Sequence, residues 1–244
     1  MKLYNVKLLT ITCEILAQEN ILEILKKHEI TGYTKYEVDG NGARGLRGQG
    51  FKNEKNIKIE VIIGEEKLQE NELARRRKSA KKACKILGVN SVSFADFPDN
   101  RMDTVPLLEI TQSIEKLIDI HKPSIIYTHH SGDVNIDHKT ISNAVITACR
   151  PQGKYSVKTI LSFEVPSSTE WQVHGGGTIF HPNFFEDISE TLEKKIKALE
   201  VYDEEMRDWP HPRSYKAVTH LANWRGATIG VEAAEAFMLR RHIN

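Results

Sequence analysis

The sequence has no long apolar run and no excess of charge of one sign. Lys and Arg number 34 against 33 Asp and Glu, so the formal net charge of +1 gives no overall attraction to nucleic acid or to an anionic membrane. No run approaches the roughly 18 apolar residues of a membrane span. The apolar stretch from Leu8 to Ile15 is interrupted by Glu14 and lacks a small-residue cleavage site, so it does not indicate a signal peptide. We therefore expect no nucleic-acid partner and no membrane partner.

Cysteine is scarce as well. Cys13, Cys84 and Cys149 are three in number, which leaves at least one unpaired, and their spacing fits no metal motif. Reduced thiols and a cytoplasmic location are expected. The 244 residues, of which 40% are hydrophobic, suffice for one large α/β domain or for two small ones.

The most informative segment is the polar run from Tyr127 to His138. It follows Ser124–Tyr127, which is typical of a short buried strand, and it precedes a helical pattern. In open α/β sheets the carboxyl end of such a strand is where ligands bind. Imidazoles and carboxylates are ligand types that zinc accepts, and a carboxylate beside an imidazole fixes its tautomer. The run therefore predicts a site, and the alternative is a polar loop capped by Asp137 or Thr140.

The order of the other segments predicts a fold class. Helical periodicity covers residues 70–87, 104–121, 138–149, 189–207 and 232–240, and strand-like runs cover 92–94, 124–127 and 159–164. Strands that alternate with helices indicate a parallel sheet covered on both faces. We predict an α/β fold with a doubly wound, mostly parallel sheet.

Several motifs resemble those of the PIG-L/LmbE family of zinc-dependent N-deacetylases. The run Thr128–His138 is similar to the family's second signature, and Asp96–Asp103 follows a strand in the family's order. Phe163–Trp171 resembles the sugar-side loop of one subgroup, and the tail around Arg225–Gly226 and Glu232–Phe237 also fits. The resemblance covers roughly residues 70–244. It implies an LmbE-like Rossmann-type domain that hydrolyses the N-acetyl group of an amino sugar or sugar conjugate, and a homo-oligomer.

The sequence departs from this family in one respect. The family carries a first-strand motif of the type His-Pro-Asp-Asp-Glu, which supplies two zinc ligands and the general base, and no such run occurs here. The only early histidine, His28, lies in a Lys-rich helical segment and is expected at its surface. The resemblance implies zinc as cofactor and His138 as a ligand, but a catalytic zinc needs about three protein ligands. An impaired hydrolase is therefore expected.

The resemblance also assigns roles to individual residues. Arg76, or Arg75 in the next register, corresponds to a cation near the reaction centre, and Asp137 to the partner of His138. His129 or His130 corresponds to a substitute acid, and hydrogen bonding in the core or in a loop is an equal alternative for either. The residues implied in substrate binding are Asn100, Arg101, Ser168, Glu170 and Trp171. For Trp171, a buried anchor in the core is an equal alternative to sugar stacking.

The segment before residue 66 resembles a different family. Strand-like runs at 6–12, 32–38 and 56–63 and a helical run at 17–28 are similar in order to the first half of a P-II-like signalling protein, over roughly residues 5–65. This implies a ferredoxin-like half-fold, β-α-β-β. We expect two parts, a segment 1–66 that packs on the main sheet and a deacetylase-like domain 67–244. Of the strands in the first segment, strand 56–63 is the one most expected to join the main sheet.

The glycine-rich stretch Asp39–Gly50 permits a second function. It holds five glycines and two arginines in twelve residues, and backbone N–H groups with guanidinium groups bind phosphates. The P-II resemblance implies nucleotide or partner binding by a non-catalytic regulatory protein, with Gly42, Arg44 and Gly45 as contacts. A flexible surface loop is an equal interpretation.

Overall fold

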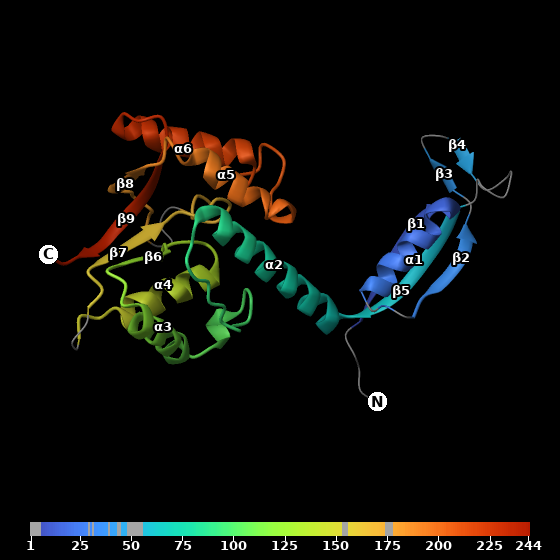
Figure 1. Cartoon of the computed structure of the whole chain (residues 1–244), viewed down its shortest axis with the longest axis horizontal. Helices are drawn as coiled ribbons and strands as arrows, with labels where there is room; N and C mark the ends of the chain where they lie inside the picture. Colours follow the sequence, from blue (N-terminus) through green and yellow to red (C-terminus); the bar gives the residue numbers. More distant parts are fainter. Residues whose placement is uncertain are drawn as a thin grey trace. The chain divides into compact units, whose positions relative to one another are not determined.

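The chain forms two units, Met1–Arg77 and Lys78–Asn244. The computed structural model (Figure 1) describes residues 6–28, 30, 32–38, 40–42, 45–47, 56–152, 156–173 and 178–244. Each unit has a sheet of its own, and the long helix α2 (Glu65–Leu87) contains the boundary between them.

The smaller unit is built on a three-stranded antiparallel sheet in the order β1-β5-β2. Its strands are β1 (Val6–Glu14), β2 (Thr34–Val38) and β5 (Asn56–Gly64). The central strand alternates, so that Ile57, Ile59 and Val61 are buried on one face. These side chains pack with Leu25 of helix α1 (Gln18–Lys27), which follows a 3₁₀ turn at Ile15–Ala17. Burying this one face against α1 creates the core of the unit.

Between β2 and β5 lies a short hairpin of β3 (Gly40–Gly42) and β4 (Gly45–Arg47). Strand 56–64 hydrogen-bonds to a neighbour on each side within the small sheet. The prediction that this strand pairs with a strand of the main sheet is therefore wrong, because both of its edges already pair with β1 and β2.

The larger unit has a four-stranded sheet in the order β6-β7-β9-β8. Its strands are β6 (Ile125–His129), β7 (Thr159–Phe163), β8 (Phe184–Asp187) and β9 (Ala234–His242). Only β6 and β7 run parallel, and β9 runs antiparallel to both of its neighbours. The sheet is thus mixed, whereas a mostly parallel sheet was predicted.

Helices cover both faces of this sheet (Figure 1). They are α3 (Leu107–His121), α4 (Ile136–Ala148), α5 (Leu192–Glu200) and α6 (Tyr215–Ile229), with 3₁₀ turns at Met102–Thr104 and Asp203–Glu205. On one face Ile160 of β7 packs with Val145 and Cys149 of α4, and Ile110 of α3 packs with Ala144. These contacts fix α4 over β6 and β7 and thereby hold its first turn at the carboxyl end of β6.

Two of the predicted elements differ. The helix predicted at residues 232–240 is strand β9, and residues 92–94 form no strand within the described residues. Ala and Glu favour a helix in isolation, but here the pairing of Ala234–His242 with β7 and β8 overrides that preference. Within the described residues, the alternating run Val92-Ser93-Phe94 belongs to none of the sheets.

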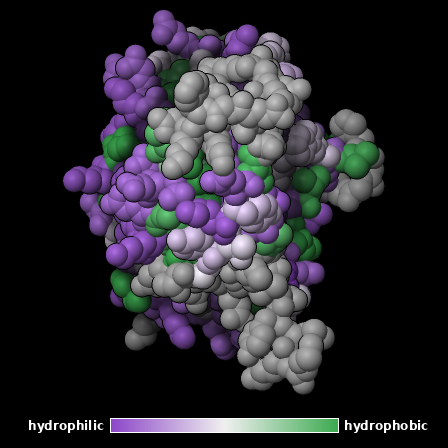
Figure 2. Space-filling view, turned by 90° about the vertical axis from the view of Figure 1, so that its right-hand side faces the viewer, coloured by the Kyte–Doolittle hydropathy of each residue, from purple (hydrophilic) through white to green (hydrophobic). Residues whose placement is uncertain are grey.

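The mean hydropathy of the chain is −0.41, although several large hydrophobic side chains, such as Leu16, Ile120 and Trp224, are exposed. On the face drawn in Figure 2, hydrophilic residues predominate and the hydrophobic ones form small separate groups. Among the helices of the described residues, none has the length and apolar character needed to cross a bilayer.

Candidate active site

The candidate site lies at the carboxyl end of β6, where the strand leads into the loop before α4. Asn135 is the N-cap of α4, and its side chain accepts hydrogen bonds from the backbone N–H groups of Asp137 (2.8 Å) and His138 (3.4 Å). This cap satisfies N–H groups that the first helical turn leaves without partners. It also fixes His138 in the first turn, facing the end of the strand.

Asp133 is the centre of the polar cluster. Its carboxylate is fully buried and accepts hydrogen bonds from the Ser168 hydroxyl, from Thr169 Oγ1 (2.9 Å) and from the Asn135 backbone N–H (2.9 Å). Burial alone raises the pKa of this carboxyl, but nearby His138 and these donors outweigh burial and hold the pKa well below its usual range. Asp133 is therefore a buried anion that joins two loops 35 residues apart.

His138 and His129 lie against each other beside this anion. Nδ1 of His138 is 3.2 Å from Oδ2 of Asp133, and the rings of the two histidines are stacked with centroids 4.1 Å apart at 19°. Burial, followed by the nearby His138, lowers the pKa of His129 to about 4, and Asp133 only partly opposes this. Nδ1 of His129 is buried without a hydrogen-bond partner within the described residues. A neutral imidazole with an unused nitrogen is suited to bind a cation or accept a proton.

Asp137 connects the start of α4 to the loop of residues 100–102. Its two carboxylate oxygens accept hydrogen bonds from the backbone N–H groups of Asn100 (2.6 Å) and Met102 (2.9 Å). The side-chain amide of Asn135 reaches Oδ1 of Asn100 at 3.3 Å. The carboxylate beside the His138 ring is thus Asp133, while Asp137 holds the loop of residues 100–102 against the start of α4.

His130 and Gly132 make the loop compact. His130 is fully buried, and its Nε2–H donates to the carbonyl of Thr178 at 2.8 Å. A side chain at Gly132 has no room, because a Cβ there would come within 1.9 Å of the Thr178 carbonyl oxygen. His130 therefore serves packing, and His129 is the histidine of the pair that stacks on His138.

The loop after β7 supplies further predicted substrate contacts. Ser168 is occupied by Asp133, and Glu170 accepts from the backbone N–H groups of Ser167 (2.6 Å) and Ser168 (3.2 Å). Trp171 is 54% exposed, and its ring meets His211 edge-on at 5.8 Å, so it is not a buried anchor. Glu170 also lines a pocket of about 200 Å³ that is bordered by Thr169, Gln172 and Phe180.

The remaining predicted residues lie elsewhere. Arg101 is exposed, and its carbonyl accepts from the backbone and hydroxyl of Thr104. Arg76 belongs to the smaller unit, where its guanidinium pairs with Glu72 one turn away, and its catalytic role stays a prediction. Gly42 and Gly45 face each other in the β3–β4 hairpin, and Arg44 is outside the described residues.

The donors at this site do not complete a catalytic zinc centre. Within the described part of the chain, no three side chains of His, Cys, Asp or Glu lie together in a way that could hold a metal ion. His138 and His129 offer imidazole nitrogens, but the Asp133 oxygens are already used by hydroxyl and N–H donors. A catalytic zinc takes three protein ligands and keeps one position open. The donors of this cluster therefore do not fit a catalytic zinc, and they support no reaction step through a metal.

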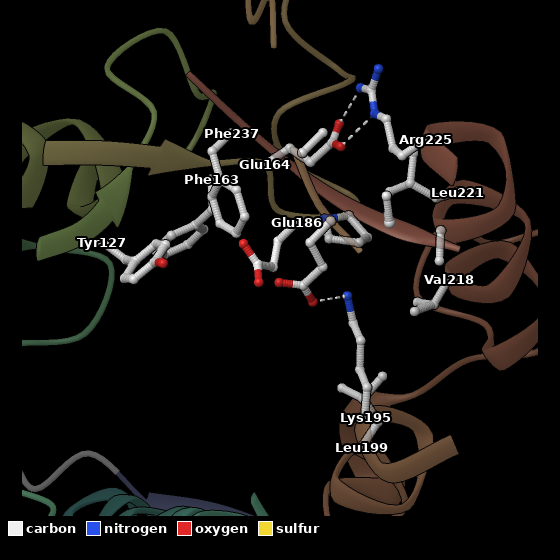
Figure 3. A pocket seen from close by; sticks show the side chains of 15 residues that line it. Tyr127, Phe163, Glu164, Glu186, Lys195, Leu199, Val218, Leu221, Arg225 and Phe237 are labelled. Carbon is white, nitrogen blue, oxygen red and sulfur yellow. Dashed lines mark hydrogen bonds and ion pairs between the residues drawn. The ribbon is translucent and has the colours of Figure 1, made fainter. Parts of the chain in front are cut away.

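A larger pocket of about 480 Å³ lies next to the cluster, between the sheet and helices α5 and α6 (Figure 3). Tyr127, Phe163 and Phe237 line one side of it, and Val218 and Leu221 of α6 line the other. The Phe163 ring also touches His129, with centroids 4.8 Å apart. Phe163 thus lies between the pocket and the histidine cluster.

Comparison with known proteins finds a family match over part of this chain. Residues 30–149 match the PIG-L family, described as GlcNAc-PI de-N-acetylase. The match begins within the segment 1–66, and it includes the cluster from His129 to His138.

Three relatives illustrate the similarity. The uncharacterized deacetylase YaiS of Escherichia coli (strain K12) is 30% identical over 123 residues, which are 47% of this chain and 57% of that protein. The conserved protein TT1542 of Thermus thermophilus superposes with a TM-score of 0.56 at 20% identity, over 70% of this chain and 75% of that chain. The N,N'-diacetylchitobiose deacetylase of Pyrococcus horikoshii superposes with a TM-score of 0.53 at 18% identity, over 69% of this chain and 64% of that chain. The matched region thus spans little more than half of the curated relative, and the two structures establish a similar α/β fold.

Proposed function

We propose that this chain is an N-deacetylase of the PIG-L/LmbE type that acts on an N-acetylated amino sugar or sugar conjugate. The family match over residues 30–149 and the similarity to a deacetylase support this assignment. The observation that carries it is the His129–His138 stack beside the buried Asp133 at the carboxyl end of β6, where α/β enzymes bind their substrates.

We propose further that its hydrolysis is impaired. Zinc is the cofactor that the family resemblance implies, and when bound it activates water for attack on an amide carbonyl. His129, His130 and His138 each have an Nδ1 without a hydrogen-bond partner in the described residues. No His-Pro-Asp-Asp-Glu segment is present in the sequence. Loss of the general base alone removes a group that typically contributes about 10²–10⁴-fold to a rate, and loss of two ligands weakens the hold on the metal.

The test measures metal content and acetate release on the same preparation. Dialysed protein is assayed for zinc by atomic absorption, and acetate release from N-acetylglucosamine and N,N'-diacetylchitobiose is followed with added zinc. We expect less than one zinc per chain and slow release that His138→Ala abolishes. The N,N'-diacetylchitobiose deacetylase of Pyrococcus horikoshii serves as the positive control for the assay with N,N'-diacetylchitobiose. Tight one-to-one zinc with a rate equal to that of the control enzyme contradicts the impairment, and release no faster than that of His138→Ala contradicts the deacetylase assignment.

A second function is proposed for the smaller unit. The β1-β5-β2 order, with a glycine hairpin between β2 and β5, favours the P-II-like interpretation, in which the loop around Gly42 and Gly45 binds a nucleotide. Titration calorimetry with ATP and ADP tests it, with Arg44→Gln as the variant and Lys35→Gln as the control. Absence of binding at millimolar nucleotide contradicts this second function.

A further inference from the structure

The 480 Å³ pocket beside α5 and α6 is lined by one carboxylate more than it has cations. Its ionisable side chains are Glu164, Glu186, Glu235, Lys195 and Arg225. Arg225 holds Glu164 through two hydrogen bonds of 2.8 and 2.7 Å, and Lys195 pairs with Glu235 at 2.5 Å. Figure 3 shows these pairs at the pocket wall. Within the described residues, Glu186 has no cation of its own.

Glu186 is an exposed side chain at the pocket wall, and it faces a second carboxylate. It lies directly opposite Glu235 in the β8–β9 ladder. Residues opposite each other on antiparallel strands have Cα atoms about 4.5–5.5 Å apart and share a face of the sheet. Two carboxylates in this arrangement repel, and like charges directly opposite destabilise a sheet. Lys195 neutralises one of them, so a second cation at the pocket wall relieves the repulsion.

The rest of the pocket suits an apolar group attached to that cation. Tyr127 and Phe237 meet at a tilted angle, with centroids 5.1 Å apart, and Phe163 extends the aromatic side. Aromatic faces attract cations as well as apolar rings. Leu199, Val218 and Leu221 supply aliphatic surface opposite. A volume of about 480 Å³ is in the range of small-molecule sites.

We propose that this pocket binds a small molecule with one ammonium group and an apolar body of about the size of an aromatic ring. The ammonium group lies against Glu186 and the ring lies among Tyr127, Phe163 and Phe237. The Lys195–Glu235 and Arg225–Glu164 pairs stay intact and border the site. This site is separate from the proposed deacetylase centre and requires no metal.

The experiment is titration calorimetry of the full chain in EDTA with three probes of similar shape. Phenethylamine carries the positive charge, phenethyl alcohol is neutral and phenylacetate is negative. We expect phenethylamine to bind about tenfold more tightly than the alcohol, the factor expected of one charge pair near a surface. Phenylacetate is expected to bind most weakly, because it meets the uncompensated carboxylate.

Two variants locate the site. Glu186→Gln is expected to weaken the amine about tenfold and to leave the alcohol unchanged, whereas Glu193→Gln, on the exposed side of α5, changes neither. Ala222→Leu fills the pocket and is expected to weaken the amine and the alcohol together, with an unchanged far-UV circular dichroism spectrum as evidence of folding. Equal affinity for all three probes, no binding at millimolar concentration, or an amine affinity unchanged in Glu186→Gln contradicts the proposal. Because no metal or turnover is involved, each of these results is independent of the deacetylase assignment.

Discussion

The imidazole rings of His129 and His138 are stacked, with centroids 4.1 Å apart at 19°, although they come from a strand and from a helix. Protonation of both would place two positive charges in contact, and burial already lowers the pKa of His129 to about 4. Near neutral pH the ring of His129 is therefore uncharged. The pair presents neutral imidazole nitrogen to a substrate or a cation, but two imidazoles do not complete the three-ligand set of a catalytic zinc.

The first prediction concerns zinc. We expect dialysed protein to retain less than one zinc per chain and His138→Ala to remove the retained metal, because His138 lacks two of the partners expected from the family resemblance. His121→Ala, at the exposed end of α3, is the matched control and is expected to keep the wild-type content. Atomic absorption measures the metal. One tightly held zinc in His138→Ala contradicts the role given to His138.

The second prediction concerns the anion at the centre of the cluster. The Asp133 carboxylate accepts hydrogen bonds from Ser168, Thr169 and the Asn135 N–H group, and Asp133→Asn removes its charge. This variant is expected to lower the free energy of unfolding by about 3 kcal/mol. Asp119→Asn on the exposed face of α3 is expected to cost less than about 0.5 kcal/mol. Urea unfolding followed by circular dichroism measures both. Equal midpoints for the two variants contradict a stabilising role of Asp133.

The third prediction concerns pH. The pKa of His129 is lowered from 6.5 to about 4 in the folded protein, so on acidification the unfolded chain takes up this proton first. The stabilising contribution is complete above pH 6.5 and is lost as the pH falls toward 4, by up to about 3 kcal/mol at 1.36 kcal/mol per pKa unit. Asp133, whose pKa lies below its usual range, loses its contribution only at lower pH.

Urea unfolding at a series of pH values between 4 and 7 checks this for the metal-free protein. His129→Gln has no proton to take up and is expected to show a shallower fall in stability across this range. His121→Gln is the matched control, with the wild-type slope. The same slope in all three proteins excludes His129 as the source of the pH dependence.

The fourth prediction concerns the tight turn at Gly132. Gly132→Ala places a Cβ within 1.9 Å of the Thr178 carbonyl oxygen, and the shift it forces is expected to cost about 2–3 kcal/mol. At Gly230 a Cβ has open space around it, so Gly230→Ala is expected to lower the free energy of unfolding only through the left-handed backbone, by about 1 kcal/mol. A comparison of urea midpoints separates the two effects. A milder loss in Gly132→Ala than in Gly230→Ala indicates that the loop relaxes.

The sequence predicted those parts of the fold that depend on local periodicity. Helices α1, α3 and α4 and strands β5, β6 and β7 lie within a few residues of their predicted positions, because their apolar residues recur at the spacing of the element they form. Strand β9 was predicted as a helix, because the Ala- and Glu-rich run favours a helix locally and only its pairing with β7 and β8 makes it a strand.

The candidate site shows the same limit. His129 and His138 could be predicted from the sequence, because they follow a strand and begin a helix. The central role of Asp133 could not, since two of its donors, Ser168 and Thr169, come from a loop 35 and 36 residues further along the chain. The Ser-Ser-Thr run after β7 is the one signal in the sequence, and its resemblance to the sugar-side loop predicts a sugar contact instead. Only the fold brings that loop to Asp133.

The last prediction concerns Trp171 and the sugar. Its ring is 54% exposed and meets His211 edge-on, so one face is open to stack on a sugar ring while Glu170 and Gln172 border the pocket beside it. We expect N-acetylglucosamine at millimolar concentration to change the tryptophan fluorescence, and Trp171→Phe to abolish most of the change. Trp209 and Trp224 are also exposed, so Trp209→Phe and Trp224→Phe are the matched controls and are expected to keep the response. If Trp171→Phe responds like the wild-type protein, the signal belongs to Trp209 or Trp224 and the loop after β7 is not part of the sugar site.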